Sequence, residues 1–377
     1  RLGQEVGKEG ADVCEILLTA YRQSGPEFVR RLNGEFTIAI YDLTEHRLMI
    51  FADHIASCPL YFEQASRYVV FGAERKFVQA VSDAPARVDP IGLLQPFVHV
   101  HNISDRTFVA GQKRLRPEEM LEIRSDGIRR TIHESLDFAK IKAGTQREII
   151  ERWQSELEAA TARRVCGSRR VSMSLSAGLD SRAVACSISR EHRPMWARTW
   201  GDPESEEVRF AKVIAQRLGF RHFLQDPAEV RHSTALKAIV WRTEGEISYR
   251  NGVSIFAHRE MKTDCDYLAG GWLGDASSGA HLRPFMFVPT SRATFVTRVF
   301  DWYCQTSAHV LRRVFRPEFL DKHMPRLRHE FEDSYKRFDD CDNVTAHEYW
   351  DLHNRQTRMT ISSMPVDSHL FLKVRPF

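Results

Sequence analysis

The sequence predicts an α+β domain followed by an α/β domain with a parallel sheet. The chain has 377 residues, which is about enough for two domains. Short strand-like runs separated by polar turns fill the chain up to about residue 132, whereas strand-like and helical segments alternate after residue 145. A turn of small and hydroxyl residues after the apolar run 171–175 leads directly into a helical segment. We therefore expect the domains at residues 1–140 and 145–377.

The N-terminal domain is expected to be β-rich with flanking helices. Apolar residues recur at helical spacing over residues 12–32, with a turn at Gly25-Pro26. Short strands are expected at residues 36–41, 47–52, 59–62 and 68–71, and further strand-like pieces at 120–123 and 130–132. Strands this short, joined by polar turns, are typical of an antiparallel meander.

The C-terminal domain begins with a long helical pattern over residues 146–165. Strands are then expected at 195–200, 221–224 and 267–271, and helices at 206–218 and 233–240. This alternation predicts a parallel sheet with helices on both faces. The tail from about residue 291 to residue 360 is rich in Arg, Phe and Trp and is expected to be helical.

Composition excludes several classes of protein. The net charge is only +4 and the two signs are interspersed, so no nucleic-acid partner is expected. No apolar run reaches the roughly 18–20 residues that span a bilayer, so no membrane association is expected. The seven cysteines are scattered and form no C-x-x-C pair, which disfavours a zinc site or a disulfide framework. We expect reduced, mostly buried thiols in a cytoplasmic protein.

The turn at residues 176–181 has the chemistry of a pyrophosphate-binding loop. Its Ser hydroxyls and main-chain N–H groups can converge on a phosphate, and the helix that follows adds about half a positive charge at its N-terminus. Asp180 supplies a carboxylate for a hard cation such as Mg²⁺, which would bridge phosphate oxygens. The loop lacks the Lys of the G-x-x-x-x-G-K-[ST] loop. We therefore expect it to bind pyrophosphate rather than to transfer a γ-phosphate.

At this loop the chain resembles the N-type ATP pyrophosphatases, whose loop reads S-[GA]-G-x-D-S. Within that group it is most similar to the asparagine synthetase family, which includes the β-lactam synthetases and lasso-peptide cyclases. The matching residues are Ser176-Ala177-Gly178-Leu179-Asp180-Ser181. The resemblance implies a partial α+β glutaminase domain of the N-terminal-nucleophile (Ntn) hydrolase-like class. It also implies an α/β synthetase domain with the adenine-nucleotide alpha-hydrolase-like, ATP-pyrophosphatase fold.

Shorter segments support the same resemblance along nearly the whole chain. Residues 25–42 are similar to the family's G-x-x-F-x-x-x-L-x-G-x-F-A-x-x-x-x-D, and residues 71–76 to its A-S-E-x-K, both from the back half of the glutaminase domain. Glutaminase chemistry in this class needs a terminal Cys whose α-amine serves as base. Here residue 1 is Arg1 and the first cysteine is Cys14, so we expect no glutaminase activity from these residues. Either the front half of the domain is absent, or this branch does not hydrolyse glutamine.

A second segment resembles the family's S-G-E-G-x-D-E. The segment reads Leu268-Ala269-Gly270-Gly271-Trp272-Leu273-Gly274-Asp275. The resemblance implies that Asp275 is a second Mg²⁺ carboxylate, acting in catalysis together with Asp180. It also implies that Gly270 and Gly271 let the backbone approach the nucleotide. Without the resemblance, the segment fits a strand end followed by a Gly-rich turn equally well.

Two residues here depart from the family pattern. Trp272 stands where asparagine synthetases carry Glu and β-lactam synthetases carry Tyr, and Ala276 replaces an acidic residue. Because Trp272 cannot take a proton, amine deprotonation needs another group; the candidates are Glu244 and Glu246, unless these two lie in a solvated turn. The large aromatic side chain also favours an amine on a larger molecule over free ammonia. Residues 373–377 resemble the family's E-x-R-x-P-F-L-D element, which places the family's catalytic Lys beyond Phe377.

The reaction implied by the resemblance is adenylation of a carboxylate by ATP, followed by attack of an amine to form an amide. The expected partners are ATP, Mg²⁺, a small-molecule or peptide carboxylate and an amine donor, and a homodimer is left open. Asparagine synthetase proper and a ring-forming enzyme are both compatible with this reaction. Two rival functions remain: another pyrophosphatase-loop enzyme, such as a tRNA-modifying or sulfur-transfer enzyme, and a non-catalytic ATP-binding or scaffold homologue.

Overall fold

The computed structural model describes residues 2–8, 10–133, 144–166, 170–191, 195–226, 232–248, 265, 267–271, 274–360 and 373–375. The chain divides into two compact units. The first unit comprises Arg1–Asp89 and Ser104–Phe138, and the second comprises Pro90–Ile103 and Ala139–Phe377. The chain therefore crosses between the units more than once, because a short segment from the N-terminal part belongs to the second unit.

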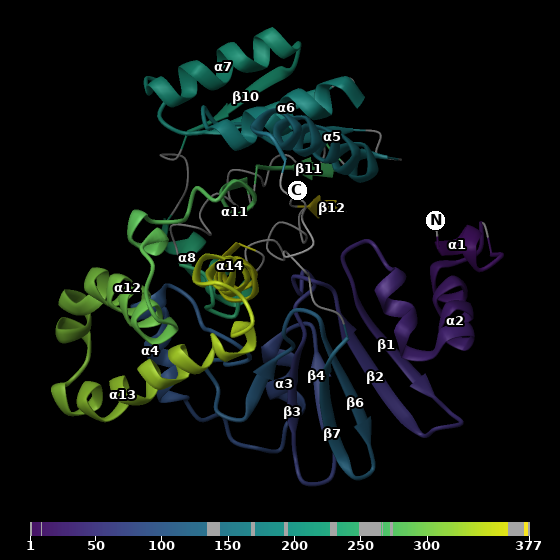
Figure 1. Cartoon of the computed structure of the whole chain (residues 1–377), viewed down its shortest axis with the longest axis vertical. Coiled ribbons are helices and arrows are strands. Elements are labelled where there is room, and N and C mark those ends of the chain that lie inside the picture. Colours follow the sequence, from purple (N-terminus) through teal and green to yellow (C-terminus); the bar gives the residue numbers. More distant parts are fainter. Residues whose placement is uncertain are drawn as a thin grey trace. The chain divides into compact units, whose positions relative to one another are not determined.

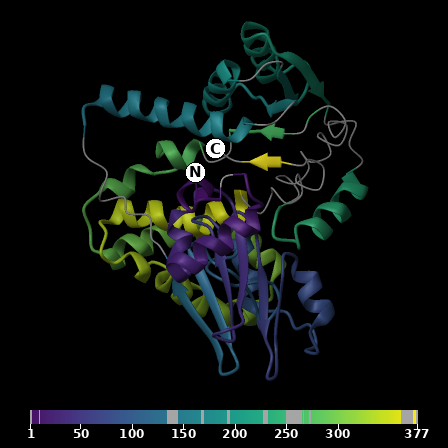
Figure 2. The ribbon, with the colours of Figure 1, turned by 90° about the vertical axis from the view of Figure 1, so that its right-hand side faces the viewer.

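The first unit contains two antiparallel sheets and short helices (Figures 1 and 2). Its elements are α1 (Leu2–Glu5), α2 (Val13–Ser24), η1 (Gly25–Arg31), β1 (Thr37–Asp42), β2 (Arg47–Ala52), β3 (Tyr61–Gln64), β4 (Val69–Gly72), α3 (Arg75–Val81), β5 (Gln112–Arg114), β6 (Glu119–Arg124) and β7 (Gly127–Ile132). Every strand expected in this unit is present, with ends shifted by up to three residues.

The strands of this unit do not form one continuous meander, and that expectation is wrong. Strands β1, β2, β6 and β7 form one sheet in that order, whereas β4, β3 and β5 form a second sheet. β2 pairs with β6, which places Ile50 opposite Leu121. Ile50 and Leu121 share a buried core with Phe62 of β3. Burial of apolar surface therefore joins β2 to the distant β6 instead of to β3, the next strand in the sequence.

Residues 12–32 form two helical elements rather than one. The Asp12 carboxylate accepts the N–H of Cys14 at 2.8 Å and so caps α2. The helix ends at Gly25, whose φ of 60° lies in the left-handed region. The 3₁₀ helix η1 follows and buries Phe28 and Val29 in a core with residues of β1 and β2. This pair of helices therefore covers one face of β1 and β2 in the first sheet.

The second unit combines a parallel sheet with a helical region, a name we use for Pro90–Ile103 together with residues 281–360. Its elements before and within the sheet are α4 (Pro90–His99), α5 (Gln146–Val165), β8 (Val171–Ser174), α6 (Leu179–Glu191), β9 (Met195–Trp200), α7 (Glu206–Leu218), β10 (Arg221–Gln225), α8 (His232–Arg242), β11 (Tyr267–Ala269) and α11 (Gly274–Ser278). The remaining elements are η5 (Pro284–Phe287), α12 (Arg292–Val314), α13 (Pro317–Asp333), η6 (Lys336–Phe338), α14 (Asn343–Trp350), the π-helix η7 (Asp351–Thr360) and β12 (Lys373–Arg375).

The sheet of the second unit is parallel, with strand order β10-β9-β8-β11-β12. Starting at β8, the chain moves outward through β9 and β10 and then returns to the other side of β8 for β11. The strand order therefore reverses between β8 and β11. In open parallel sheets, ligands bind beyond the carboxyl ends of the strands at such a reversal.

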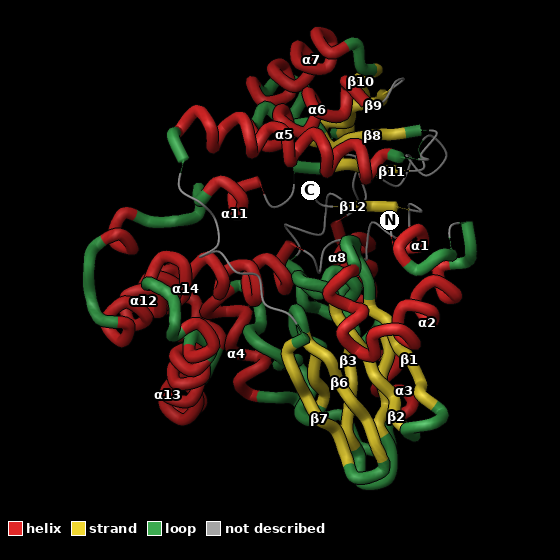
Figure 3. The backbone as a smooth tube through the Cα atoms, turned by 45° about the vertical axis from the view of Figure 1, so that its right-hand side comes forward, coloured by secondary structure: helices red, strands yellow, loops and turns green. Residues whose placement is uncertain are grey.

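Helices α5, α6 and α7 pack on one face of this sheet (Figure 3). The register aligns Val171, Met195 and Tyr267 across β8, β9 and β11, so their side chains share that face. All three are buried together with Val165 of α5 and Ala185 of α6. This packing fixes the helix that follows β8, and with it the loop between strand and helix.

Helix α4 packs against α12 and α13 in the helical region. The ring of Phe97 meets that of Phe315 edge-on at 5.0 Å, and His99 stacks on Phe331 at 4.9 Å. The Ser307 hydroxyl donates to the main-chain oxygen of Val98 at 3.3 Å. Residues 90–103 are therefore part of the core of the helical region, although they lie between strands of the first unit in the sequence.

The cysteines do not follow the expectation of mostly buried thiols. Only Cys265 of the seven is buried, whereas Cys14, Cys166 and Cys186 are exposed. All seven are free. Within the described ranges, none of the helices combines the length and apolar character needed to cross a bilayer.

Three of the buried histidines in the helical region, His99, His101 and His347, are at most 2% exposed. Burial lowers the pKa of His101 and of His347 to about 4, and it lowers the pKa of His99 well below its ordinary value of 6.5. All three imidazoles are therefore neutral in the folded protein at neutral pH.

We predict that the second unit loses stability as the pH falls from about 6.5 to about 4, because over this range the unfolded chain binds protons that the folded chain rejects. Each histidine contributes up to about 1.4 kcal/mol per pH unit to this loss. Urea unfolding measured at several pH values tests it, with His99→Phe, which keeps the ring stack, as the matched variant. The variant should show a shallower pH dependence. Unfolding free energies that do not change with pH in either protein would contradict the prediction.

Candidate functional site

The two segments singled out in the sequence lie side by side at one edge of the parallel sheet. β8 pairs with β11, with Ser172 opposite Leu268 and Met173 opposite Ala269. Residues 176–181 follow the carboxyl end of β8, and residues 270–275 follow the carboxyl end of β11. Both segments therefore flank the point where the strand order reverses, which is the usual ligand position in such sheets.

The loop after β8 is held by its own serines. The Ser176 and Ser181 hydroxyl oxygens are 3.0 Å apart, and the Ser181 hydroxyl also donates to the main-chain oxygens of Ser176 and Gly178 at 3.1 and 3.2 Å. The N–H of Gly178 donates to the Ser176 hydroxyl at 3.1 Å. Helix α6 begins at Leu179, so the loop ends at a helix N-terminus, which favours anions. Leu179 and Asp180 are exposed, and Ala177 is half-buried.

Two glycines of the second segment lie against Asp180. A Cβ atom on Gly271 would stand 2.7 Å from the main-chain nitrogen of Ser181 and 2.9 Å from the carbonyl carbon of Asp180. A Cβ atom on Gly274 would stand 2.3 Å from the Asp180 carboxylate carbon. The chain therefore needs glycine at both positions to bring the segments this close. Gly270, by contrast, is buried.

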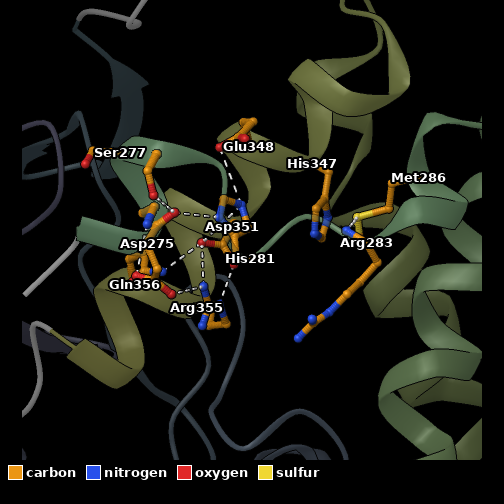
Figure 4. A network of polar contacts seen from close by, with 12 residues as sticks. Asp275, Ser277, His281, Arg283, Met286, His347, Glu348, Asp351, Arg355 and Gln356 are labelled. Carbon is orange, nitrogen blue, oxygen red and sulfur yellow. Dashed lines mark hydrogen bonds and ion pairs between the residues drawn. The ribbon is translucent and has the colours of Figure 1, made fainter. Parts of the chain in front are cut away.

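Asp275 follows Gly274 directly and is held by residues from the helical region (Figure 4). Its Oδ2 atom lies 3.4 Å from Nη2 of Arg355, and its Oδ1 atom accepts the N–H of Ala276 at 2.9 Å. The Nδ1–H of His281 donates to its main-chain oxygen at 3.2 Å. The Asp275 side chain is 46% exposed, so it remains open to a ligand.

Behind Asp275 lies the buried carboxylate of Asp351, the first residue of η7. Arg355 donates to Asp351 through both Nε and Nη2, and Gln356 donates to it at 2.9 Å. Nε2 of His281 lies 3.9 Å from the same carboxylate. Burial raises the pKa of Asp351, but the hydrogen bond and charge of Arg355 outweigh burial and hold the pKa below its ordinary value. Asp351 is therefore a buried anion that fixes Arg355.

The acidic turn considered in the sequence is not solvated. Glu244 and Glu246 are both buried, and Oε1 of Glu246 lies 3.5 Å from Nη1 of the buried Arg358. Glu244 adopts a positive φ of 58°, a strained conformation for a residue other than glycine. Trp272, the residue on which the expected amine preference rests, lies outside the described residues.

The structure thus brings together the segments around Asp180 and Asp275, and it adds residues to which sequence reasoning gave no site role. These are Gly274, His281, Asp351 and Arg355. The sequence holds a signal for two of these residues. Asp351 and Arg355 are four residues apart, which makes their side chains neighbours on a helical surface.

The acidic residues fit a site for a cation that is shared with phosphate. Among the residues that the structure describes, no group of three or more His, Cys, Asp or Glu side chains is arranged to hold a metal ion by itself. Two carboxylates completed by phosphate oxygens and water are nevertheless the usual protein share of a Mg²⁺ site. The lack of a side chain at Gly274 lets the residue before Asp275 lie against the Asp180 carboxylate.

The fold and the site define a protein of two units, in which the parallel sheet of the second unit carries the anion-binding loop of residues 176–181. Comparison with family models agrees: residues 6–134 match the glutamine amidotransferase domain, and residues 152–276 match asparagine synthase. The chain belongs to the asparagine synthetase family.

Several bacterial asparagine synthetases are similar to parts of this chain. Asparagine synthetase [glutamine-hydrolyzing] 3 of Bacillus subtilis is 28% identical over 171 residues, covering 45% of this chain and 28% of the relative. Asparagine synthetase [glutamine-hydrolyzing] 1 of Bacillus subtilis is 22% identical over 289 residues, covering 73% of this chain and 45% of the relative. Asparagine synthetase B of Escherichia coli is 42% identical over 52 residues, covering 14% of this chain and 9% of the relative. Each match thus spans less than half of the relative's length.

A solved structure, the NH3-dependent NAD synthetase from Campylobacter jejuni, is also similar to part of the chain. The likeness covers 48% of this chain and 95% of that one, with 14% sequence identity and a TM-score of 0.26.

We predict that alanine destabilises the protein at both site glycines. In Gly271→Ala the new methyl meets main-chain atoms of residues 180 and 181, and in Gly274→Ala it meets Cβ and Cγ of Asp180 at 2.6 and 2.3 Å. Rotation of the Asp180 side chain cannot relieve the contact with its Cβ, so the free energy of unfolding should fall by about 1–3 kcal/mol in each variant. Urea unfolding of the two variants beside the unaltered protein measures both. An unchanged free energy of unfolding in either variant would show that the two segments do not approach as described.

Proposed function

We propose that this chain binds ATP at the carboxyl ends of β8 and β11 and forms an amide by way of an acyl-adenylate. The observation that carries the proposal is the contact of Gly271 and Gly274 with Asp180, which brings an anion-binding loop and two carboxylates to one edge of the sheet. Membership of the asparagine synthetase family supports the same reaction class.

In the first step, an oxygen of the substrate carboxylate attacks the α-phosphorus of ATP. The bond from that phosphorus to the bridging oxygen breaks, and pyrophosphate leaves. In this proposal the leaving phosphates lie at the loop of residues 176–181 and at the N-terminus of α6, whose positive end favours an anion. The hydrogen bonds among Ser176, Gly178 and Ser181 fix the path of the loop before the reaction, so little reorganisation of the backbone is needed as negative charge develops.

Asp180 and Asp275 would hold Mg²⁺ in this proposal. Mg²⁺ bound there supplies positive charge for the pyrophosphate that departs. In the second step the amine nitrogen attacks the acyl carbon, the bond from that carbon to the adenylate oxygen breaks, and AMP leaves with its electron pair. The proton released from the amine needs an acceptor, and the position that carries Glu in asparagine synthetases is Trp272 here.

A second, narrower candidate concerns the amine. Trp272 replaces the acidic residue that would receive a proton from ammonia, and its size suits an apolar wall beside a larger substrate. This substitution favours an amine carried on a larger molecule, as in ring formation, over free ammonia as in asparagine synthesis.

We predict that Asp180→Ala abolishes ATP–pyrophosphate exchange measured with a panel of candidate carboxylates. Asp180 is exposed, so its loss should leave the fold intact. Glu207→Ala, which removes an exposed acid from α7 of the same unit, is the matched control and should retain exchange. Circular dichroism and melting temperature check that both variants fold.

Exchange that persists undiminished in Asp180→Ala would place the nucleotide elsewhere. If the unaltered protein neither exchanges pyrophosphate nor binds ATP, the chain is better described as a non-catalytic homologue, and the proposed reaction is wrong.

We predict that the protein does not make asparagine efficiently when given aspartate, ATP and ammonium. Ammonia lacks its usual proton acceptor when Trp272 takes the place of Glu. Asparagine is quantified by chromatography, and AMP and pyrophosphate are followed in parallel. Trp272→Glu serves as the comparison and should raise the yield with ammonium. Asparagine formed by the unaltered protein at about 1–10 per second, an ordinary enzymatic rate, would exclude the larger amine.

A further inference from the structure

The side chain of Arg355 connects two carboxylates that differ in their environment. Asp351 is buried, with a side chain that is 2% exposed, and it receives both Nε and Nη2 of Arg355. Asp275 lies on the other side, 46% exposed, with its Oδ2 atom 3.4 Å from the same Nη2. Figure 4 shows the guanidinium between the two carboxylates. The buried acid thus fixes the guanidinium, and the guanidinium contacts the exposed acid.

The contacts of Asp351 explain why Arg355 has little freedom. Gln356 donates to the same carboxylate, and η7, which carries Asp351, Arg355 and Gln356, is a π-helix. Arg355 itself is only 17% exposed. Burial would lower its pKa, but the hydrogen bond and charge of Asp351 raise it, so the guanidinium stays charged. A planar guanidinium that donates two of its own N–H groups to one carboxylate is held in a fixed orientation, and it can therefore fix the position of a third group that contacts it.

Asp275, in contrast, has few restraints of its own. It lies in the five-residue helix α11, and within the described chain its side chain makes one contact outside that helix, the contact with Arg355. A half-exposed Asp on so short a helix would otherwise sample more than one rotamer. The contact with Arg355 therefore selects one orientation of the carboxylate before any ligand arrives.

We propose that Arg355 is a positioning residue that orients the Asp275 carboxylate for the cation of a metal–nucleotide complex, with Asp351 as its buried anchor. This inference rests on the proposed function, because it assumes that Asp275 meets a cation bound to ATP. Arg355 acts through Asp275 and not on the substrate. Hydrogen-bonding partners of this kind fix ligand geometry, and their loss typically weakens metal binding by about 10–100-fold.

The test measures how strongly a divalent cation aids nucleotide binding. Binding of a non-hydrolysable ATP analogue is measured by calorimetry, once with Mn²⁺ and once with EDTA, and the ratio of the two Kd values gives the contribution of the cation. In Arg355→Met this ratio should fall about tenfold or more. Arg355→Lys keeps the charge beside Asp351 but not the planar fork, so it should lose most of the ratio while remaining folded.

Arg292→Met is the matched control. Arg292 belongs to the same helical region and donates through Nη2 to the main-chain oxygens of Phe338, Cys341 and Asp342. Its loss should lower the melting temperature without changing the ratio of the Kd values. A merely structural Arg355 would behave in the same way, or would weaken binding equally with and without the cation.

The outcomes separate the two proposals. If the unaltered protein does not bind the analogue under either condition, the proposed function fails and this inference fails with it. If it binds with a clear cation dependence that folded Arg355→Lys and Arg355→Met retain, the proposed function stands and the positioning role of Arg355 is wrong. Tighter cation-dependent binding in these variants would also overturn it, because Arg355 would then compete with the cation for Asp275.

Discussion

The pairing of β8 with β11 is the constraint on which the site depends. The two strands are separated by more than ninety residues in sequence, yet they are neighbours in the sheet, with Val171 opposite Tyr267. Because both strands are parallel, the segments that follow them emerge at the same edge. A shift of this register would move Gly271 and Gly274 away from Asp180. It would also separate the loop of residues 176–181 from the segment that carries Asp275.

Sequence reasoning succeeded where the signal is local. The helices at 146–165 and 206–218 were expected with the same bounds that the structure shows. Each has a strong start signal: Thr145 forms a capping box with Glu148, and Ser205 accepts the N–H of Val208. The loop at residues 176–181 was found for the same reason, because its six residues carry the turn, the hydroxyl groups and the start of the helix within one short stretch.

Sequence reasoning failed where a feature depends on partners that are distant in sequence. Nothing near β3 indicates that it pairs with β5 rather than with β2, so a single meander was expected instead of two sheets. The contact between Arg355 and Asp275 could not be expected for the same reason, since the two residues are eighty positions apart in the sequence. The need for glycine at position 274 follows from the proximity of Asp180, which no local pattern reveals. The contact between Asp351 and Arg355 was not expected either, although their spacing of four residues along a helix could have indicated it.

The placement of α4 has a consequence for how the protein can be divided. The chain leaves the first unit after Asp89, contributes Pro90–Ile103 to the second unit, and returns at Ser104 before its last crossing near residue 138. Division of the chain at any single position therefore cannot give two fragments that each contain one complete unit. A fragment that starts at residue 145 would contain the whole parallel sheet but would expose the apolar surfaces of Phe315 and Phe331 that α4 covers. Such a fragment would become an aggregation hazard unless Pro90–Ile103 were supplied separately as a peptide.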